Sequence, residues 1–167
     1  MINIKKASNK KEFIIIEKLA YEILHKVYDP IIPAEHTDYF LNKFQSPKAI
    51  ENQIKNEGFA YYLLQYENKN TGYLGVQRLK KKLILSKLYI LKSHRGLKIG
   101  KSALNFIHEF SKHHKLEKIE LIVNQENKNT INIYEREGYK IIDSIINSFP
   151  NGHSVQDFKM EKTLNYN

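Results

Sequence analysis

Residues 83–104 read LILSKLYILKSHRGLKIGKSAL, an apolar run that passes through a short basic turn into a helical pattern. The basic and glycine residues in or beside this turn are Arg95, Gly96, Lys98, Gly100 and Lys101. The first amides of a helix lack intrahelical partners and the helix dipole favours negative charge there, while glycines let a ligand approach the backbone closely. The stretch therefore predicts a strand, a turn and a helix N-terminus that together bind phosphate.

The turn at residues 95–100 resembles motif A of the GNAT family of acyl-CoA N-acyltransferases. In that family the turn reads Arg/Gln-x-x-Gly-x-Gly/Ala and wraps the pyrophosphate of acetyl-CoA. Here it reads Arg95-Gly96-Leu97-Lys98-Ile99-Gly100, so Lys98 stands where the family has its first glycine. Lysine suits this position poorly if the backbone needs a positive φ, and it is harmless if the backbone there is helical.

A second stretch, residues 121–139, reads LIVNQENKNTINIYEREGY and resembles GNAT motif B. That motif places Asn-x-x-Asn after a strand, followed by a small residue, a tyrosine, and a glycine with an aromatic residue. The matching positions are Asn124, Asn127, Thr130, Tyr134, Gly138 and Tyr139, with threonine where alanine is usual. The two motifs occur in the family's order with a helical pattern between them, so their joint match is specific.

The resemblance covers residues 59–164 well and implies that acetyl-CoA is the cosubstrate. In the family, the strand before the turn hydrogen-bonds the pantetheine arm through its backbone. The cofactor-binding residues implied here are Leu88, Tyr89, Ile90, Arg95, Gly96, Leu97, Lys98, Ile99, Gly100, Lys101, Asn127 and Thr130. Two alternatives stay open: residues 88–90 form a core strand only, and Asn127 caps the following helix, instead of or besides contacting the cofactor.

Tyr134 is the catalytic residue that the resemblance implies. In the family the phenol of this tyrosine protonates the departing CoA thiolate. A thiol with a pKa of about 8.5 needs only modest acid help, which a phenol with a pKa of about 10 gives when it is held within reach. The alternative is an aromatic ring packed on the inner face of its helix.

The general base is not determined by the sequence. Many family members supply a carboxylate from the strand before the turn, whereas the corresponding face here carries Ile84, Ser86 and Leu88. The remaining candidates are Glu35, Glu120, His153 and Asp157, and a water chain to solvent is a further possibility. His94, next to the turn, is expected to be a surface residue or a neighbour of the phosphate rather than a base. The other histidines show no metal-ligand spacing, and no metal is expected.

The composition limits the classes of protein. At 167 residues we expect a single N-acetyltransferase domain, with residues 1–58 on the acceptor side and residues 59–164 forming the CoA-binding core. The chain has no cysteine, which excludes disulfides and a cysteine acyl-enzyme and fits a cytoplasmic location. No apolar run approaches the ~18 residues of a membrane helix, and no signal peptide is visible, so no membrane partner is expected.

The net charge of +9 suits a polyanion, but the lysines are scattered, so CoA is a better expected partner than nucleic acid.

The hydrophobic pattern predicts a mixed α/β fold, which is also the order of the GNAT fold. Strands are predicted at 2–5, 59–66, 72–79, 83–91, 119–123, 139–146 and 154–160, with turns at 67–70 and 150–152. Helices are predicted at 12–24 (capped by Ser8), 35–44, 46–56 (capped by Ser46), 99–113 and 128–137 (ended by Gly138). The predicted core stripe of the fourth helix is Ile99, Ala103, Phe106, Ile107 and Phe110. The resemblance implies a twisted, mostly antiparallel sheet of about seven strands with helices on its faces, whose splayed central strands form the CoA cleft.

The expected function is acetyl transfer from acetyl-CoA to a primary amine of a small molecule, by direct attack in a ternary complex. A looser resemblance, to the bacterial GNAT enzymes that acetylate polyamines, suggests a polycationic acceptor, to which Glu35, Asp38 and Glu51 would be suited. One alternative is acetylation of protein N-termini or lysines. The alternatives from other classes are a catalytically silent CoA-binding regulatory domain and a basic nucleic-acid-binding domain. The protein is expected to be a monomer or a homodimer.

Overall fold

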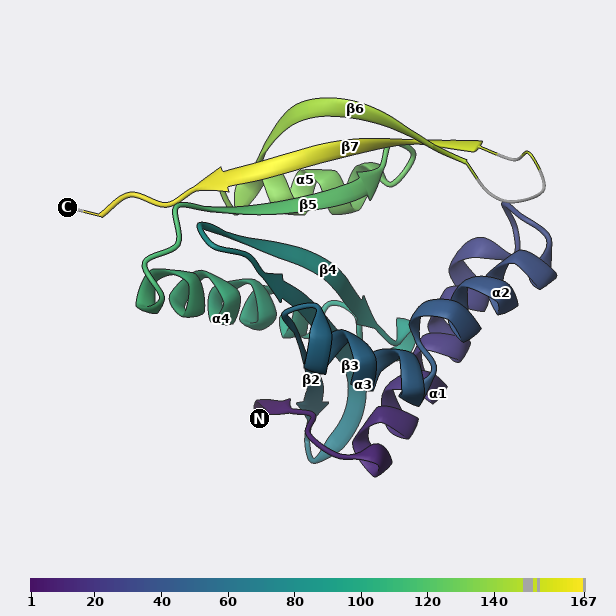
Figure 1. Ribbon diagram of the computed structural model, residues 1–167. Coiled ribbons are helices and arrows are strands. Elements are labelled where there is room, and N and C mark those ends of the chain that lie inside the picture. The colour runs from purple at the N-terminus through teal and green to yellow at the C-terminus, as the bar shows by residue number, and fades with distance from the viewer. Residues whose placement is uncertain (149–151, 153, 167) are drawn as a thin grey trace. The chain divides into compact units, whose positions relative to one another are not determined.

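The structure, a computed structural model, describes residues 1–148, 152 and 154–166. Its strands are β1 (Ile2–Lys6), β2 (Phe59–Tyr66), β3 (Lys69–Arg78), β4 (Lys82–Ile90), β5 (Lys118–Asn124), β6 (Lys140–Ser148) and β7 (Ser154–Thr163). Its helices are α1 (Lys10–Tyr28), α2 (Ala34–Phe44), α3 (Pro47–Asn56), the short 3-10 helix η1 (Lys92–His94), α4 (Ile99–His113) and α5 (Lys128–Arg136). Figure 1 shows these elements along the chain.

The chain forms two compact units, and β4 passes from one into the other. The first unit comprises Met1–Gln77 and Lys87–Ala103, and the second comprises Arg78–Ser86 and the chain from Leu104 onward. The strands follow the order β1-β2-β3-β4-β5-β7-β6, in which β4 and β5 are parallel and the other described pairs are antiparallel. The predicted fold class, a mixed α/β protein with a mostly antiparallel seven-stranded sheet, is confirmed.

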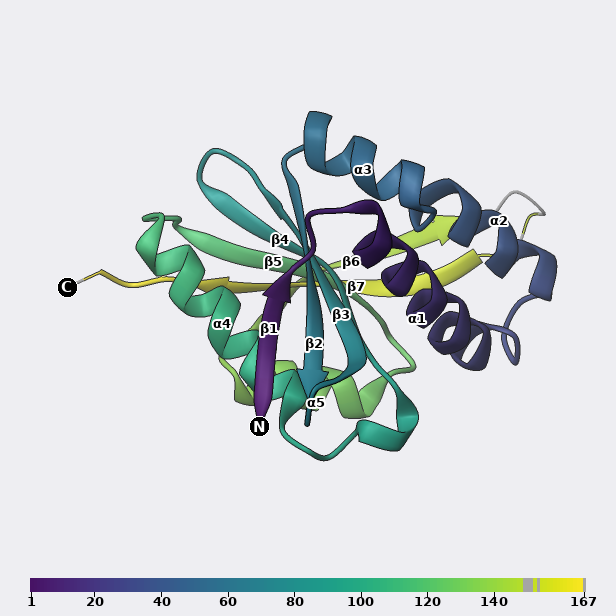
Figure 2. The same ribbon diagram turned by 90° about the horizontal axis from the view of Figure 1, so that it is seen from below.

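In the first unit, apolar faces of the N-terminal helices and of β2 and β3 form one core. Figure 2 shows α1, α2 and α3 beside one another. The buried residues of this core are Ala7, Phe13, Ile16, Leu19, Ala20, Ile23, Leu24, Leu41, Ile50, Tyr61, Leu63 and Tyr73. The hairpin between β2 and β3 turns through Glu67 and Asn68, whose φ angles of 47° and 63° are those of a tight two-residue turn. This turn is shorter than the predicted one.

A buried polar network ties the junction of α2 and α3 to β2 and β3. The Gln45 side chain is fully buried; its Nε2 donates to Tyr61 Oη at 3.1 Å, and Tyr73 Oη donates to its Oε1 at 2.6 Å. Tyr61 Oη donates in turn to Gln53 Oε1 at 2.5 Å. Because buried polar groups are costly when unpaired, these bonds fix where the two helices rest on the strands.

Gly72 allows β3 to approach β4 closely. A Cβ added at Gly72 would lie 2.3 Å from the backbone oxygen of Tyr89 and 3.1 Å from Ile90 Cα. Gly72→Ala should therefore lower the free energy of unfolding by about 1–3 kcal/mol, because backbone atoms cannot move aside cheaply. Urea denaturation measures this, with Gly100→Ala, whose Cβ would meet only Ile90 Cδ1 at 3.4 Å, as the control. An unchanged free energy for Gly72→Ala would mean that the two strands are not this close.

The second unit contains the first half of β4, the strands β5, β7 and β6, and α5. Lys82–Leu85 of β4 pair with Lys118–Leu121 of β5, and β7 pairs with β5 on one side and β6 on the other. Figure 1 shows α5 lying along these three strands. Gly138, with a φ of 95°, follows the C-cap of α5 as predicted. Within the residues that the structure describes, no helix is long and apolar enough to cross a membrane.

Three local predictions are wrong. The N-cap of α1 is Asn9, whose side chain accepts a hydrogen bond from Glu12 N at 3.1 Å, while Ser8 N donates to the Glu12 carboxylate. That helix also continues one turn beyond residue 24, to Tyr28. In α4 the rings of Phe106 and Phe110 are only half-buried, whereas Leu104 and Ser111 are buried beside Ile99, Ala103 and Ile107. Of the predicted turn at 150–152, residues 150 and 151 lie outside the described residues.

Candidate active site

The second half of β4 and the turn after it form a continuous segment of the first unit. Leu88, Tyr89 and Ile90 are half-buried, and the ring of Tyr89 lies 5.7 Å from that of Tyr73. Leu91 N donates to Thr71 O at 2.8 Å, which anchors the end of the strand to β3. The predicted pantetheine-binding strand is thus held in place by its neighbour on one side.

The basic turn is exposed and internally hydrogen-bonded. His94 N donates to Leu91 O at 2.9 Å, which closes η1, and Arg95 Nε donates to Ile90 O at 3.3 Å. The exposed residues of the predicted phosphate turn are Arg95, Gly96, Leu97, Lys98 and Lys101. Ile99 is an exception, because its side chain is buried and only its backbone N–H can serve a ligand.

The backbone of the turn passes twice through the left-handed region before α4 begins. Gly96 has a φ of 82° and Lys98 a φ of 64°. Lys98 O accepts the first helical bond, from Ser102 N at 3.0 Å, so the amides of residues 99–101 precede the first intrahelical donor. The family's glycine position is therefore one that needs a positive φ, and Lys98 occupies it at a conformational cost.

Lys98→Gly should relieve this cost. We expect the free energy of unfolding to stay level or rise by about 1 kcal/mol, because glycine adopts positive φ without a Cβ clash but loses more backbone entropy. Lys98→Ala, which keeps the Cβ and removes the charge, is the matched control and should not gain. Acetyl-CoA affinity, measured by calorimetry, should fall less than about tenfold, as for one exposed charge. A complete loss of binding would show that the Lys98 ammonium itself holds the phosphate.

Asn127 and Thr130 lie at the start of α5, in the second unit. Asn127 occupies the N-cap position, since Ile131 N donates to its backbone oxygen at 3.0 Å, but its side chain makes no capping hydrogen bond. Asn127 is exposed and Thr130 is half-buried. The helix therefore does not use the Asn127 side chain, which leaves its amide for another role.

Tyr134 lies on the inner face of α5 beside Tyr139. Its side chain is 8% exposed, and the two rings meet edge to face with centroids 5.6 Å apart. Burial raises the pKa of Tyr134 to about 12, so its phenol is protonated throughout the physiological pH range. The Tyr134 ring therefore packs on the inner face of α5, and its hydroxyl stays in the protonated form that can donate a proton.

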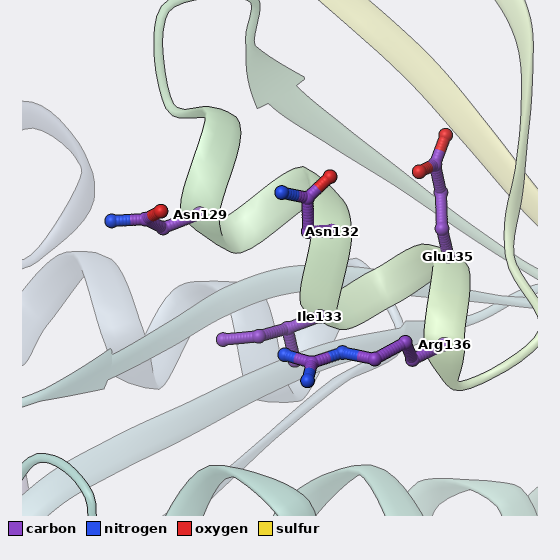
Figure 3. Close-up of a pocket in the computed structure, with 5 residues that line it drawn as sticks. All are labelled: Asn129, Asn132, Ile133, Glu135 and Arg136. Carbon is purple, nitrogen blue, oxygen red and sulfur yellow. The ribbon is translucent and has the colours of Figure 1, made fainter.

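The outer face of α5 borders a hollow of about 670 Å³ (Figure 3). Asn129, Asn132, Ile133, Glu135 and Arg136 line it. Figure 3 shows Asn129, Ile133 and Arg136 pointing to the same side of the helix, with Glu135 pointing away from them. The motifs do not predict these residues as part of a site; the signal in the sequence is the i, i+4, i+7 spacing of 129, 133 and 136.

Glu120 is a poor base because three lysines surround it. Its carboxylate lies 3.0 Å from Lys82 Nζ, 3.4 Å from Lys118 Nζ and 3.6 Å from Lys159 Nζ, and the residue is 4% exposed. Burial by itself would raise the pKa of Glu120, but the hydrogen bond from Lys82 and the neighbouring positive charges lower it overall. A carboxylate with a lowered pKa does not take up a proton near neutral pH.

Two of the other base candidates, Glu35 and Asp157, lie in different units of the chain. Glu35 is exposed in the first turn of α2, and Asp157 on β7 is 9% exposed and accepts a hydrogen bond from Asn147 Nδ2 at 2.5 Å. His153 lies outside the described residues. Across residues 1–148, 152 and 154–166, no cluster of three or more His, Asp or Glu side chains could hold a metal ion.

Comparison with known proteins places the chain in a family. A family model described as an acetyltransferase (GNAT) domain matches residues 28–164. No protein of curated function matches the sequence.

Solved structures share the fold. The PaiA N-acetyltransferase of Thermoplasma acidophilum, solved with coenzyme A, superposes with a TM-score of 0.82 at 20% identity, covering 98% of this chain and 99% of that one. The ribosomal-protein-alanine N-acetyltransferase of Escherichia coli superposes with a TM-score of 0.73 at 15% identity, covering 100% of this chain and 96% of that one. A spermidine N-acetyltransferase chimera from Vibrio cholerae and a human enzyme superposes with a TM-score of 0.73 at 15% identity. The match covers 97% of this chain and 94% of that one. Because the family model spans most of the sequence, including both motifs, the chain belongs to the GNAT family of N-acetyltransferases.

Proposed function

We propose that the protein transfers the acetyl group of acetyl-CoA to a primary amine of a small molecule, by direct attack in a ternary complex. The observation that carries the proposal is the β4–turn–α4 segment. Its exposed basic side chains and helical amides form the anion-binding arrangement that a pyrophosphate requires. We treat residues 1–167 as one N-acetyltransferase domain, with residues 1–58 on the acceptor side and residues 59–164 binding CoA.

In this proposal the pyrophosphate binds the turn from Arg95 to Lys101, and the pantetheine arm runs along Leu88–Ile90. An extended arm that pairs with backbone groups of a strand is ordinary β-addition. Asn127 and Thr130 of α5 contribute further contacts to the cofactor. Support comes from the exposure of the turn and from the unused side-chain amide of Asn127.

The chemistry begins when the neutral amine attacks the thioester carbonyl carbon. The tetrahedral intermediate loses one proton from its nitrogen to solvent and collapses, the carbon–sulfur bond breaks, and the Tyr134 hydroxyl donates its proton to the departing sulfur. The tyrosinate then takes a proton from solvent, which replaces the one that the nitrogen released. A thiol has a pKa of about 8.5, so the thiolate is a fair leaving group and needs limited help. Burial raises the pKa of Tyr134 to about 12, so the phenol enters this step in its protonated form.

The acceptor side offers less negative charge than its sequence suggests. Asp38 Oδ1 lies 2.8 Å from His25 Nε2, and Glu51 Oε1 lies 3.1 Å from Lys55 Nζ, so both carboxylates are paired. Of the three acidic residues considered for a polycation, Glu35 is the one without a described ion pair, and it is exposed. These observations favour a small amine of low charge over a large polycation.

An acceptor panel tests the proposal. Spermidine, simple primary amines and short peptides with free N-terminal alanine are offered with acetyl-CoA, and thiol release and product mass are followed. We expect small amines to be acetylated faster than peptides. Acetylation of peptides alone would favour a protein N-acetyltransferase, and acetyl-CoA binding without any release would favour a silent regulatory domain.

A further inference from the structure

A polar cluster joins α1 and α2 in the first unit, and the proposed chemistry does not use it. His25, in the last turn of α1, lies between two carboxylates. Its Nδ1 is 2.9 Å from both carboxylate oxygens of Asp29, the C-cap residue of α1, and its Nε2 is 2.8 Å from Oδ1 of Asp38 on α2. Thr37 Oγ1 of α2 donates to Asp29 Oδ1 at 3.2 Å. These four residues, which we call the clasp, link the two helices.

Both ring nitrogens of His25 face a carboxylate, and this geometry requires the imidazolium. In the neutral ring one nitrogen carries the proton and the other a lone pair, so only one of the two carboxylates can accept a hydrogen bond. The other carboxylate would face the lone pair at 2.8 or 2.9 Å. The imidazolium donates from both nitrogens, and the C-terminal end of α1 also favours a positive charge in its last turn. The clasp is therefore complete only while His25 is protonated.

Other ionisable groups adjoin the clasp on its own two helices. A hollow of about 280 Å³ between α1 and α2 is lined by Asp38 together with Glu17, Lys18 and Tyr21. The Tyr21 ring lies 4.5 Å from the imidazole ring of His25. Glu17 and Lys18 carry opposite charges, so their effects on the protonation of His25 oppose each other.

The two aspartates of the clasp decide the charge of His25. On the other elements that pack against α1, ionisable groups have partners of their own, since Glu51 of α3 pairs with a lysine of the same helix and Tyr61 of β2 bonds to a buried glutamine. On α2, His36 adjoins the clasp in the sequence. Burial by itself would lower the pKa of His25, but the hydrogen bonds and negative charges of the two aspartates raise it overall.

We propose that His25 holds α2 against α1 while it is protonated, and that loss of this proton weakens the contact between the two helices. A histidine whose pKa is raised on folding stabilises the fold fully below its ordinary value of about 6.5, and this contribution is lost as the pH rises through the folded value. The hydrogen bond from Thr37 to Asp29 does not depend on the proton, so α2 loosens rather than detaches. Because α2 belongs to the proposed acceptor side, the clasp makes acceptor affinity depend on pH; this consequence, unlike the clasp itself, rests on the proposed acetyl transfer.

Proton NMR of the full chain measures the titration of His25, whose signal is assigned by its loss in His25→Gln. Asp38→Asn keeps the size of the side chain and removes its charge, so it should lower the pKa of His25. Glu22→Gln, which breaks an exposed ion pair with Lys26 on α1, is the matched control and should leave that pKa unchanged. A wild-type His25 pKa at or below about 6.5, or one that Asp38→Asn does not lower, would overturn the proposal.

Amide hydrogen exchange of α2, corrected for the intrinsic effect of pH, measures the contact between the helices. From about pH 6 to about pH 9, on either side of the ordinary histidine pKa, protection of α2 in the wild type should fall about fivefold, the scale of a partly exposed ion pair. In His25→Gln the protection of α2 should be low at both pH values, and in each protein α3 serves as the internal reference. Equal protection of α2 at both pH values in the wild type would contradict the pH-dependent contact.

The consequence for the acceptor has a measurement of its own. The ratio of the amine KM of His25→Gln to that of wild type should be several-fold at about pH 6 and approach one at about pH 9, because the ratio cancels the protonation of the amine itself. Glu22→Gln should match wild type at both pH values, and acetyl-CoA affinity should not change. A ratio of one at both pH values would overturn the link to the acceptor. A protein that acetylates no amine would overturn the proposed transfer, while NMR and hydrogen exchange would still decide on the clasp.

Discussion

Tyr134→Phe should lower the turnover number by about tenfold or more while leaving acetyl-CoA affinity nearly unchanged. The substitution removes only the hydroxyl that protonates the departing thiolate, and general acids contribute at least this much to such steps. The ring stays, so its edge-to-face packing on Tyr139 is preserved. Thiol release measures turnover, and titration calorimetry measures affinity.

Tyr139→Phe is the matched control for this experiment. Tyr139 is buried in contact with Tyr134, and burial raises its pKa as well, but the proposed mechanism gives its hydroxyl no part. Its turnover should stay close to that of wild type. A Tyr134→Phe protein with normal turnover would remove Tyr134 from the chemistry and leave it as a packing residue of α5.

Gly100→Asp should weaken acetyl-CoA binding by about 10- to 100-fold. Gly100 is in the first turn of α4, where the amides are proposed to receive the pyrophosphate. A carboxylate there repels the phosphates and competes for the same N–H groups, and charge-assisted hydrogen bonds of this kind are worth about 1.5–3 kcal/mol. The helix itself should tolerate the change, because a negative charge near a helix N-terminus is stabilising.

Gly100→Asn separates charge from size in this prediction. Asparagine has the shape of aspartate without its charge, and a Cβ at this position meets Ile90 Cδ1 at 3.4 Å, an ordinary contact. We expect the asparagine variant to bind acetyl-CoA several times better than the aspartate variant in calorimetry. Normal binding by Gly100→Asp would mean that the pyrophosphate lies elsewhere.

Much of the fold follows from local pattern. The limits of α4, Ile99–His113, and of β2, Phe59–Tyr66, agree with the sequence prediction, because helical periodicity and a β-branched or aromatic run each dominate their segment. Ser46 caps α3 as expected, since its hydroxyl accepts from Ala49 N at 3.2 Å. The cap of α1 was ambiguous because Ser8 and Asn9 are both good caps, and only the hydrogen bond to Glu12 N decides between them.

The site is harder to predict from the sequence than the fold, because its decisive properties depend on residues far apart in the chain. The motif predicts a turn at residues 95–100, but the positive φ of Lys98 is a property of the folded backbone. Glu120 is a plausible base in the sequence, and only the pairing of β4, β5 and β7 brings three lysines to it.

Acetyl transfer itself is tested most directly by incubating the wild-type protein with acetyl-CoA and a pool of primary amines, and measuring thiol release together with the mass of the products. We expect release of free CoA in step with an acetylated amine, and this release should fall sharply in Tyr134→Phe. Acetyl-CoA that remains intact with every amine, under conditions where calorimetry shows that it is bound, would contradict the proposed acetyl transfer.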